Sequence, residues 1–115
     1  MVQYQALDER LDRTFAALAD PTRRDILDRL GLGPASISEL AAPTGMSLTG
    51  MKKHVHILEG AGLVTTEKVG RTRRCRLGPE RLEDAAQWIQ LHRQRWERRL
   101  DGLEAYLARH KGARR

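Results

Sequence analysis

The feature that most constrains the fold of this chain is a pair of short helical segments separated by a proline and a glycine. Residues 36–39 read SISE, a capping-box pattern in which the serine and the glutamate each satisfy a backbone donor at the start of a helix. Pro43 cannot continue that helix, and Gly45 can take a positive φ angle, so the segment ends there. Ser47 then caps a second helix, predicted to run from about Ser47 to Glu59. Two short helices joined by so tight a turn form a helix-turn-helix motif.

A β-hairpin is predicted directly after this motif. Residues 63–69 have the composition of a strand, residues 70–73 (GRTR) that of a hairpin tip, and residues 74–77 that of the returning strand. In the returning strand Cys75 and Leu77 alternate with two arginines, which turns one face inward and the other toward solvent. A hairpin in this position is a wing, so the sequence predicts a winged helix-turn-helix.

Longer helices are predicted at both ends of the chain. The first spans residues 4–18, the next begins at Asp20-Pro21, and the last spans residues 79–109, with an apolar stripe of about seven turns. So small a domain cannot cover that last helix, so we expect its stripe and that of the first helix to pack against a second copy of the chain. The residues expected at this dimer interface are Leu7, Leu11, Phe15, Trp88, Trp96, Leu100, Leu103 and Leu107. The predicted fold is a single domain over residues 1–115, mainly α with a small hairpin, in the order α-α-α-α-β-β-α.

Positive charge is concentrated in the middle of the chain. The formal net charge of the 115 residues is +6. Residues 45–78 hold seven Lys or Arg against two Glu, whereas residues 1–44 hold five against seven acidic residues. The charge excess therefore coincides with the predicted second helix and wing, and it favours a polyanionic partner, most often nucleic acid.

Two surfaces of this basic segment are predicted to contact double-stranded DNA. Met51, Val55 and Leu58 recur at helical spacing and face inward, which leaves the opposite face of the helix for base edges in the major groove. The wing suits phosphates or a narrow minor groove, where arginine gains from the enhanced negative potential. The predicted DNA-contacting residues are Ser47, Thr49, Gly50, Lys52, Lys53 and His56 on the helix, with Lys68, Arg71, Thr72 and Arg73 on the wing. The alternative for each is a solvated basic surface without a ligand.

The histidines and the cysteine have structural explanations that are simpler than metal binding or redox sensing. His54 and His56 lie on roughly opposite faces of one helix, so they cannot chelate one ion together. His54 is expected to pack or hydrogen-bond on the inner side, and His92 and His110 can meet only across a dimer. Cys75 is the single cysteine, so no intrachain disulfide can form. We expect it to be a small core residue, although flanking arginines would favour a redox-sensing thiolate.

No motif of an enzyme, a cofactor site or a membrane protein is found in the sequence. There is no glycine-rich phosphate loop, nucleophile elbow or paired-histidine zinc motif, so no catalytic residue, metal ligand or cofactor is predicted. The N-terminus lacks the basic start and apolar run of a signal peptide, and no stretch approaches the roughly 20 apolar residues of a membrane span. A cytoplasmic location is the expectation.

The chain resembles the ArsR family of winged-helix repressors. Residues 15–27, FAALADPTRRDIL, are close to the opening signature of that family, the stretch from Ser47 to Val64 resembles its recognition helix and strand entry, and Gly70-Arg71 matches its wing turn. The resemblance implies a homodimer joined through its first and last helices that binds an inverted-repeat operator, usually as a repressor. Residues 36–41 (SISELA) lack the Cys-x-Cys motif of metal-sensing members, and Glu83-Asp84 lacks the following histidine of their Asp-x-His pattern.

Two other functions remain open at this point. One keeps the fold and adds control by a metal, and the other is a protein-interaction module with the last helix as a scaffold. The sequence does not reveal the operator, the regulated genes, or whether a small-molecule, metal or protein effector exists.

Overall fold

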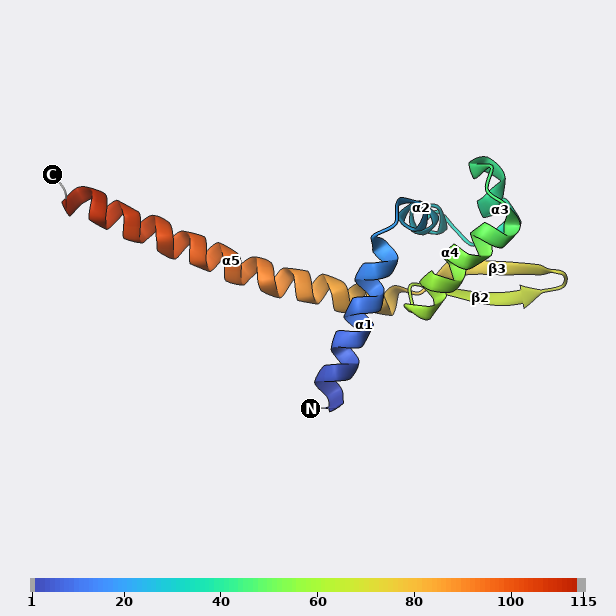
Figure 1. The fold of residues 1–115 in the computed structure, drawn as a ribbon, viewed down its shortest axis with the longest axis horizontal. Helices are drawn as coiled ribbons and strands as arrows, with labels where there is room; N and C mark the ends of the chain where they lie inside the picture. Colours follow the sequence, from blue (N-terminus) through green and yellow to red (C-terminus); the bar gives the residue numbers. More distant parts are fainter. Residues whose placement is uncertain (1, 114–115) are drawn as a thin grey trace. The chain divides into compact units, whose positions relative to one another are not determined.

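The computed structural model describes residues 2–113, and within them the side chains of residues 6–79 and 82–110. Helices and strands follow one another as Figure 1 shows. The helices are α1 (Val2–Leu18), α2 (Pro21–Leu30), α3 (Ile37–Ala41), the short 3₁₀ helix η1 (Ala42–Thr44), α4 (Leu48–Gly60) and α5 (Pro79–Ala113), and the strands are β1 (Ala35–Ser36), β2 (Val64–Val69) and β3 (Thr72–Leu77). The chain divides into two compact units, one up to Ala85 and the other from Ala86 onward.

The ends of the helices follow the capping signals in the sequence. Asp20 precedes α2 and accepts hydrogen bonds from the backbone N–H groups of Thr22 and Arg23. The capping box is formed before α3, where Ser36 Oγ accepts from the backbone N–H of Glu39 and the Glu39 carboxylate accepts from that of Ser36. After η1, Gly45 has the predicted positive φ angle, of 71°. These residues fix where α2 and α3 begin and where η1 ends.

The arginines of α2 cap the carboxyl ends of two neighbouring helices. Arg23 and Arg24 donate to the carbonyl oxygens of residues 16, 17 and 18 at the end of α1. Arg29 donates to the carbonyls of Glu39 and Leu40 in α3, both at 2.6 Å. The last carbonyls of a helix have no partner within it, so these side chains satisfy groups that water would otherwise have to reach. α2 therefore holds α1 and α3 in place.

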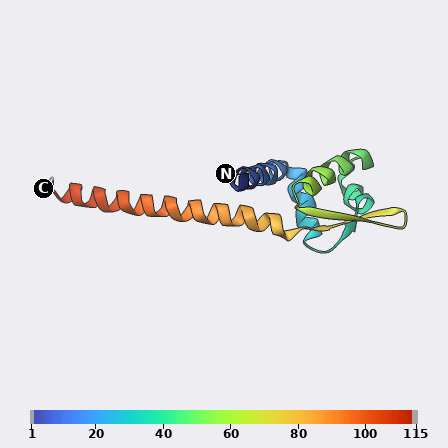
Figure 2. The same cartoon turned by 90° about the horizontal axis from the view of Figure 1, so that it is seen from below.

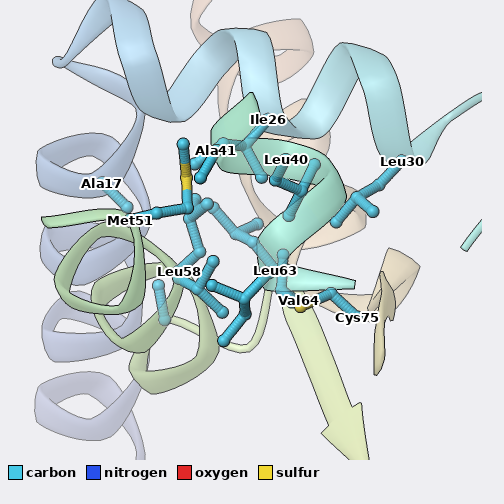
Figure 3. Packing of buried hydrophobic residues seen from close by; sticks show 13 residues of the cluster. Ala17, Ile26, Leu30, Leu40, Ala41, Met51, Leu58, Leu63, Val64 and Cys75 are labelled. Carbon is cyan, nitrogen blue, oxygen red and sulfur yellow. The ribbon is translucent and has the colours of Figure 1, made fainter. Parts of the chain in front are cut away.

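A small apolar core lies between α2, α3, α4 and the base of the sheet (Figure 3). Met51 and Leu58 reach it from α4, Ile26 from α2 and Leu40 from α3, and each is 0–1% exposed. The inward face predicted for α4 is confirmed, since Val55 is buried as well. Burying large aliphatic side chains stabilises a fold by roughly 1.5–3 kcal/mol each. This packing holds α4 by one face and leaves the other to solvent.

The sheet has three antiparallel strands in the order β1-β3-β2. The sequence predicted only the hairpin, because β1 is just two residues long and exists through its pairing with β3, Ala35 opposite Cys75 and Ser36 opposite Arg74. The predicted tip, residues 70–73, is also too long: Val69 pairs with Thr72, so the loop is Gly70-Arg71 alone. A two-residue hairpin loop needs a positive φ at its first position, and Gly70 supplies 63°. The hairpin projects beyond the helices of its own unit (Figures 1 and 2).

α5 is a single uninterrupted helix. It begins at Pro79 as predicted and ends at Ala113, four residues beyond the predicted end at 109. Ala85 is buried, whereas the apolar side chains at residues 86–110 are exposed. Among the described residues, no helix combines the length and the apolarity that a membrane span requires.

Candidate nucleic-acid interface

α4 begins where the sequence predicted and is divided into two faces. Ser47 is its N-cap, and its hydroxyl accepts from the backbone N–H of Gly50 at 3.1 Å. Beyond the cap, Thr49, Lys52, Lys53 and His56 are exposed, opposite the buried apolar residues. One face of a helix anchored in the core therefore presents a hydroxyl, two ammonium groups and an imidazole.

Gly50, expected among the DNA-contacting residues, lies where a side chain would be crowded by two neighbouring side chains. A Cβ built on Gly50 would lie 3.1 Å from Met46 Cγ and 3.3 Å from Ser47 Oγ. Both contacts are tighter than ordinary van der Waals distances, so glycine lets the turn before α4 fold closely over its first residues. The structure thus gives Gly50 a packing function at the entry to the helix.

His54 faces α2, as expected from its place beside Val55. A guanidinium nitrogen of Arg23 lies 3.4 Å from His54 Nδ1 and donates to it, since arginine has no acceptor. Asp20 lies beside the same arginine, at 3.9 Å. His56 is exposed on another face of α4. Among the described residues, no group of three or more His, Cys, Asp or Glu side chains is placed to hold a metal ion.

The wing presents a row of exposed basic side chains. Lys68 and Arg73 are register partners across the hairpin, and Arg71 lies in its two-residue loop. Lys68, Arg71, Thr72 and Arg73, the residues of the wing expected to contact DNA, are all exposed. Arg76, on the same strand, forms an ion pair with Glu67 at 3.1 Å. The wing therefore offers cations along its length and at its tip.

Three residues connect the wing to the last turn of α4. Thr66 Oγ1 in β2 donates to Glu59 Oε2 at 2.5 Å and accepts from Arg73 Nε in β3 at 3.1 Å. We call Glu59, Thr66 and Arg73 the wing relay. The sequence indicated a function for Arg73 but for neither Thr66 nor Glu59. Thr66 lies in an ordinary strand pattern, and nothing in that pattern indicates that its hydroxyl meets a helix seven residues earlier.

Two hollows lie on the α4–wing side of the unit. The larger has a volume of about 710 Å³ and is lined by Thr49, Lys52, Lys53 and His56 of α4 together with all three residues of the wing relay. The smaller, of about 420 Å³, lies between Lys52 at the start of α4 and Lys68, Arg71 and Arg73 of the wing. Glu59 lines the larger hollow, and it is the one acidic residue in either lining. The α4–wing side therefore has a positive character.

Cys75 is enclosed by the core rather than displayed on the wing. Its side chain is 0% exposed. Burial raises the pKa of the Cys75 thiol, Glu59 raises it further, and Arg73 opposes the shift. The raised pKa favours the thiol over the thiolate, so the surroundings do not provide the activation that the flanking arginines suggested.

The predicted dimer-interface residues fall into two groups. In α1, Leu11 is buried within the protomer, Phe15 is partly buried and Leu7 is 36% exposed. In α5, Trp96, Leu100, Leu103 and Leu107 are 52–60% exposed and Trp88 is 38% exposed. Trp88 also stacks on His92 with ring centroids 4.0 Å apart, and His92 Nδ1 donates to the Trp88 carbonyl. α5 therefore carries most of the apolar surface that this protomer leaves uncovered.

The helix-turn-helix and hairpin together define a winged helix-turn-helix protein, and comparison with known proteins places the chain more closely. Residues 18–67 match the family model of a helix-turn-helix domain. The HTH-type transcriptional regulator Rv2034 of Mycobacterium tuberculosis is 40% identical over 68 residues, which are 59% of this chain and 64% of Rv2034. The match thus spans slightly less than two thirds of that relative's own length.

Solved structures agree with this class. The crystal structure of an ArsR family transcriptional regulator is 44% identical, with a TM-score of 0.75, and the match covers 78% of this chain and 93% of that chain. The homodimeric winged helix-turn-helix DNA-binding domain of a possible ArsR-family regulator from Mycobacterium bovis is 29% identical, with a TM-score of 0.64, covering 78% and 83%. The chain belongs to the ArsR family of transcriptional regulators.

Proposed function

We propose that this protein is a homodimeric transcriptional repressor that binds an inverted-repeat operator in double-stranded DNA. The observation that carries the proposal is the division of α4, whose apolar face is fixed in the core while Thr49, Lys52, Lys53 and His56 are exposed. An α-helix fits the major groove, and side chains near its start reach base edges there. Belonging to a family of transcriptional regulators supports this function for the exposed face.

The wing supplies the second set of contacts in this proposal. Arg71 occupies the tip of a hairpin that projects beyond the helices of its unit, with Lys68 and Thr72 next to it on the two strands. A guanidinium at such a tip binds a phosphate, or enters a narrow minor groove, where the negative potential is strongest. Each phosphate contact releases condensed counterions, so operator affinity is expected to fall steeply with salt.

The test of DNA binding uses a duplex that the wild-type protein selects from a random-sequence library. Replacing both Lys52 and Lys53 by alanine should weaken binding to this duplex by about 10- to 100-fold, because two charged contacts are lost per protomer. The matched control is R98A/R109A, which removes the same charge from the α5 face opposite the apolar stripe and should bind normally. Equal affinity of the K52A/K53A variant and the wild type would refute the assignment of α4 as the reading helix.

The dimer in this proposal rests on the uncovered stripe of α5. Its apolar residues are about half exposed, and a second copy would remove this surface from water. A relative is homodimeric, which supports the same state here. Sedimentation at micromolar concentration should give a dimer for the wild type, a monomer for L100D, and a dimer for A105D, whose side chain lies on the opposite face of the same helix. A monomeric wild type would refute the dimer.

Repression is the last part of the proposal, and it follows the usual role of the family. The operator half-sites are expected to overlap a promoter, so that the bound dimer excludes polymerase. Genome-wide mapping of bound DNA, with transcript levels measured after deletion of the gene, tests it: bound promoters should become more active in the deletion. Lower transcription from those promoters would show an activator instead.

A further inference from the structure

The wing relay differs from the other polar contacts of the hairpin because it reaches a second element. Arg76 and Glu67 pair within the wing, whereas the Thr66 hydroxyl joins β2 to α4 through Glu59 and to β3 through Arg73. A threonine hydroxyl has one hydrogen to donate. Here that hydrogen goes to Glu59, while the oxygen accepts from Arg73, so both functions of the hydroxyl are in use between the reading helix and the wing.

The position of the relay explains what it can control. Its three residues line the larger hollow together with the exposed face of α4. Glu59 lies in the last turn of α4, and Arg73 lies in β3, separated by Thr72 from the two-residue loop that holds Arg71. Fixing these two points relative to each other fixes the separation between the side chains predicted to read bases and the wing tip predicted to contact the backbone.

We propose that Thr66 is a positioning residue for operator binding, and that Arg73 acts mainly through it rather than as a phosphate contact. This inference rests on the proposed function, since it concerns how α4 and the wing engage the same duplex. Without the relay, the wing can change its angle to α4. The entropy cost of fixing that angle then reduces the affinity for DNA instead of being part of folding. Preorganised contacts avoid that cost. Neither Thr66 nor Glu59 needs to touch DNA for this to hold.

A near-isosteric substitution tests the hydroxyl directly. Thr66→Val keeps the branched shape suited to a strand but removes both hydrogen bonds, whereas Thr66→Ser keeps the hydroxyl. We expect T66V to bind the selected duplex about three- to tenfold more weakly than the wild type, the range that follows from losing one or two net hydrogen bonds, and T66S to bind nearly as the wild type does. Wild-type affinity of T66V, or equal weakening of T66S and T66V, would overturn the proposal.

The dependence of affinity on salt separates positioning from direct contact. The plot of log K against log salt has a negative slope, and loss of one phosphate contact makes it shallower by about 0.9. R71A, which removes a predicted direct contact, should make the slope shallower. T66V and R73A should weaken binding at every salt concentration and leave the slope unchanged. A slope for R73A as shallow as that for R71A would show that Arg73 is a phosphate contact after all.

A double-mutant cycle completes the test and covers the case of a poorly folded T66V protein. If Arg73 acts through Thr66, R73A should add no further loss once T66V is present, so the T66V/R73A double variant should bind as T66V does, and additive losses would contradict this. If T66V melts at a much lower temperature than the wild type, R73A can test the relay by itself. Arg73 is exposed, so its replacement should not disturb folding. The proposed function fails in a different way: the wild type would then select no duplex, or K52A/K53A would bind the selected duplex as tightly as the wild type does. If the wild type binds the selected duplex and T66V binds it equally well, the relay alone is refuted.

Discussion

The arginines of α2 and those of the wing have the same chemistry and opposite surroundings. In α2, Arg23, Arg24 and Arg29 donate to backbone carbonyls at the ends of α1 and α3. On the wing, the arginines are exposed, and the bonds they make stay within the α4–wing side of the molecule. The first group is used to hold helices together, and the second remains accessible to a partner.

This difference shows what a charge count can and cannot reveal. Residues 1–44, which contain α2, have more acidic than basic residues, yet the arginines of α2 donate to helix-end carbonyls within the protomer. Bonds from a guanidinium to neutral carbonyls involve no counterion release and are weakly affected by salt. Contacts proposed between the exposed wing cations and DNA phosphates would gain their free energy largely from displaced counterions, so salt would weaken them. Stability and salt-dependent binding should therefore respond separately to the two groups.

Replacing Arg29 gives the largest effect expected from the α2 group. Arg29→Met keeps the aliphatic stem but leaves the carbonyls of Glu39 and Leu40 without their 2.6 Å donors. We expect the free energy of unfolding to fall by about 2–3 kcal/mol, because a partly buried acceptor is left unsatisfied. Urea denaturation followed by circular dichroism measures it. Arg29→Lys, which can still donate to one carbonyl, should lose less, and a loss as large as that of R29M would show that the paired geometry is what matters.

Replacing Arg71 gives the largest effect expected from a single arginine of the wing. R71A should weaken operator binding by about 1 kcal/mol per protomer and lower the salt slope, because a tip cation is lost. Its free energy of unfolding should match that of the wild type, since the residue lies in an exposed loop. R71K, which keeps the charge, should keep most of the salt slope. A clear loss of stability in R71A would remove the distinction between the two groups of arginines.

Much of the fold could be predicted because its signals are local. The capping box at Ser36, the break at Gly45 and the apolar spacing of Met51, Val55 and Leu58 each depend on residues within one or two turns. Helix ends and buried faces follow from such patterns without knowledge of the rest of the chain. The inward position of Cys75 followed in the same way from strand alternation.

The features that were missed depend on contacts between distant segments. β1 has no strand pattern of its own, since two residues become a strand only when β3 lies alongside. The roles of Arg23, Arg29 and Thr66 are set by carbonyls and a carboxylate on other elements. Sequence patterns show that these side chains are polar, but only the packed fold shows which group each one meets.

A smaller effect is expected from acid at the α2–α3 junction. Hydrogen bonds from the backbone and side chain of Ser36, and more weakly the charges of Arg74 and Arg29, hold the pKa of Glu39 below its ordinary value. The folded state then binds this proton less readily than the unfolded state, so the stabilisation is present above the ordinary pKa and is lost as the pH falls through the lowered one. Between pH 6 and pH 3, wild-type stability should fall more than that of E39Q, measured by urea denaturation. Parallel curves for the two proteins would contradict this.

The smallest effect is predicted for metal ions, and Arg23 supplies the reason. Its guanidinium donates to His54 Nδ1 at 3.4 Å, so a cation at that nitrogen would displace the arginine and lie beside its positive charge. His56 is on another face of α4 and cannot complete a site with it. We therefore expect nickel, zinc and cobalt to change operator affinity by less than about twofold, since a ligand shifts an equilibrium only through differential binding.

Equilibrium dialysis shows whether a metal is retained in a stoichiometric amount. If one is retained and alters affinity, H54Q tests the site next to Arg23 and an H92Q/H110Q variant tests α5. Loss of the response in H54Q would show that the α2 arginine is less fixed than its contacts indicate.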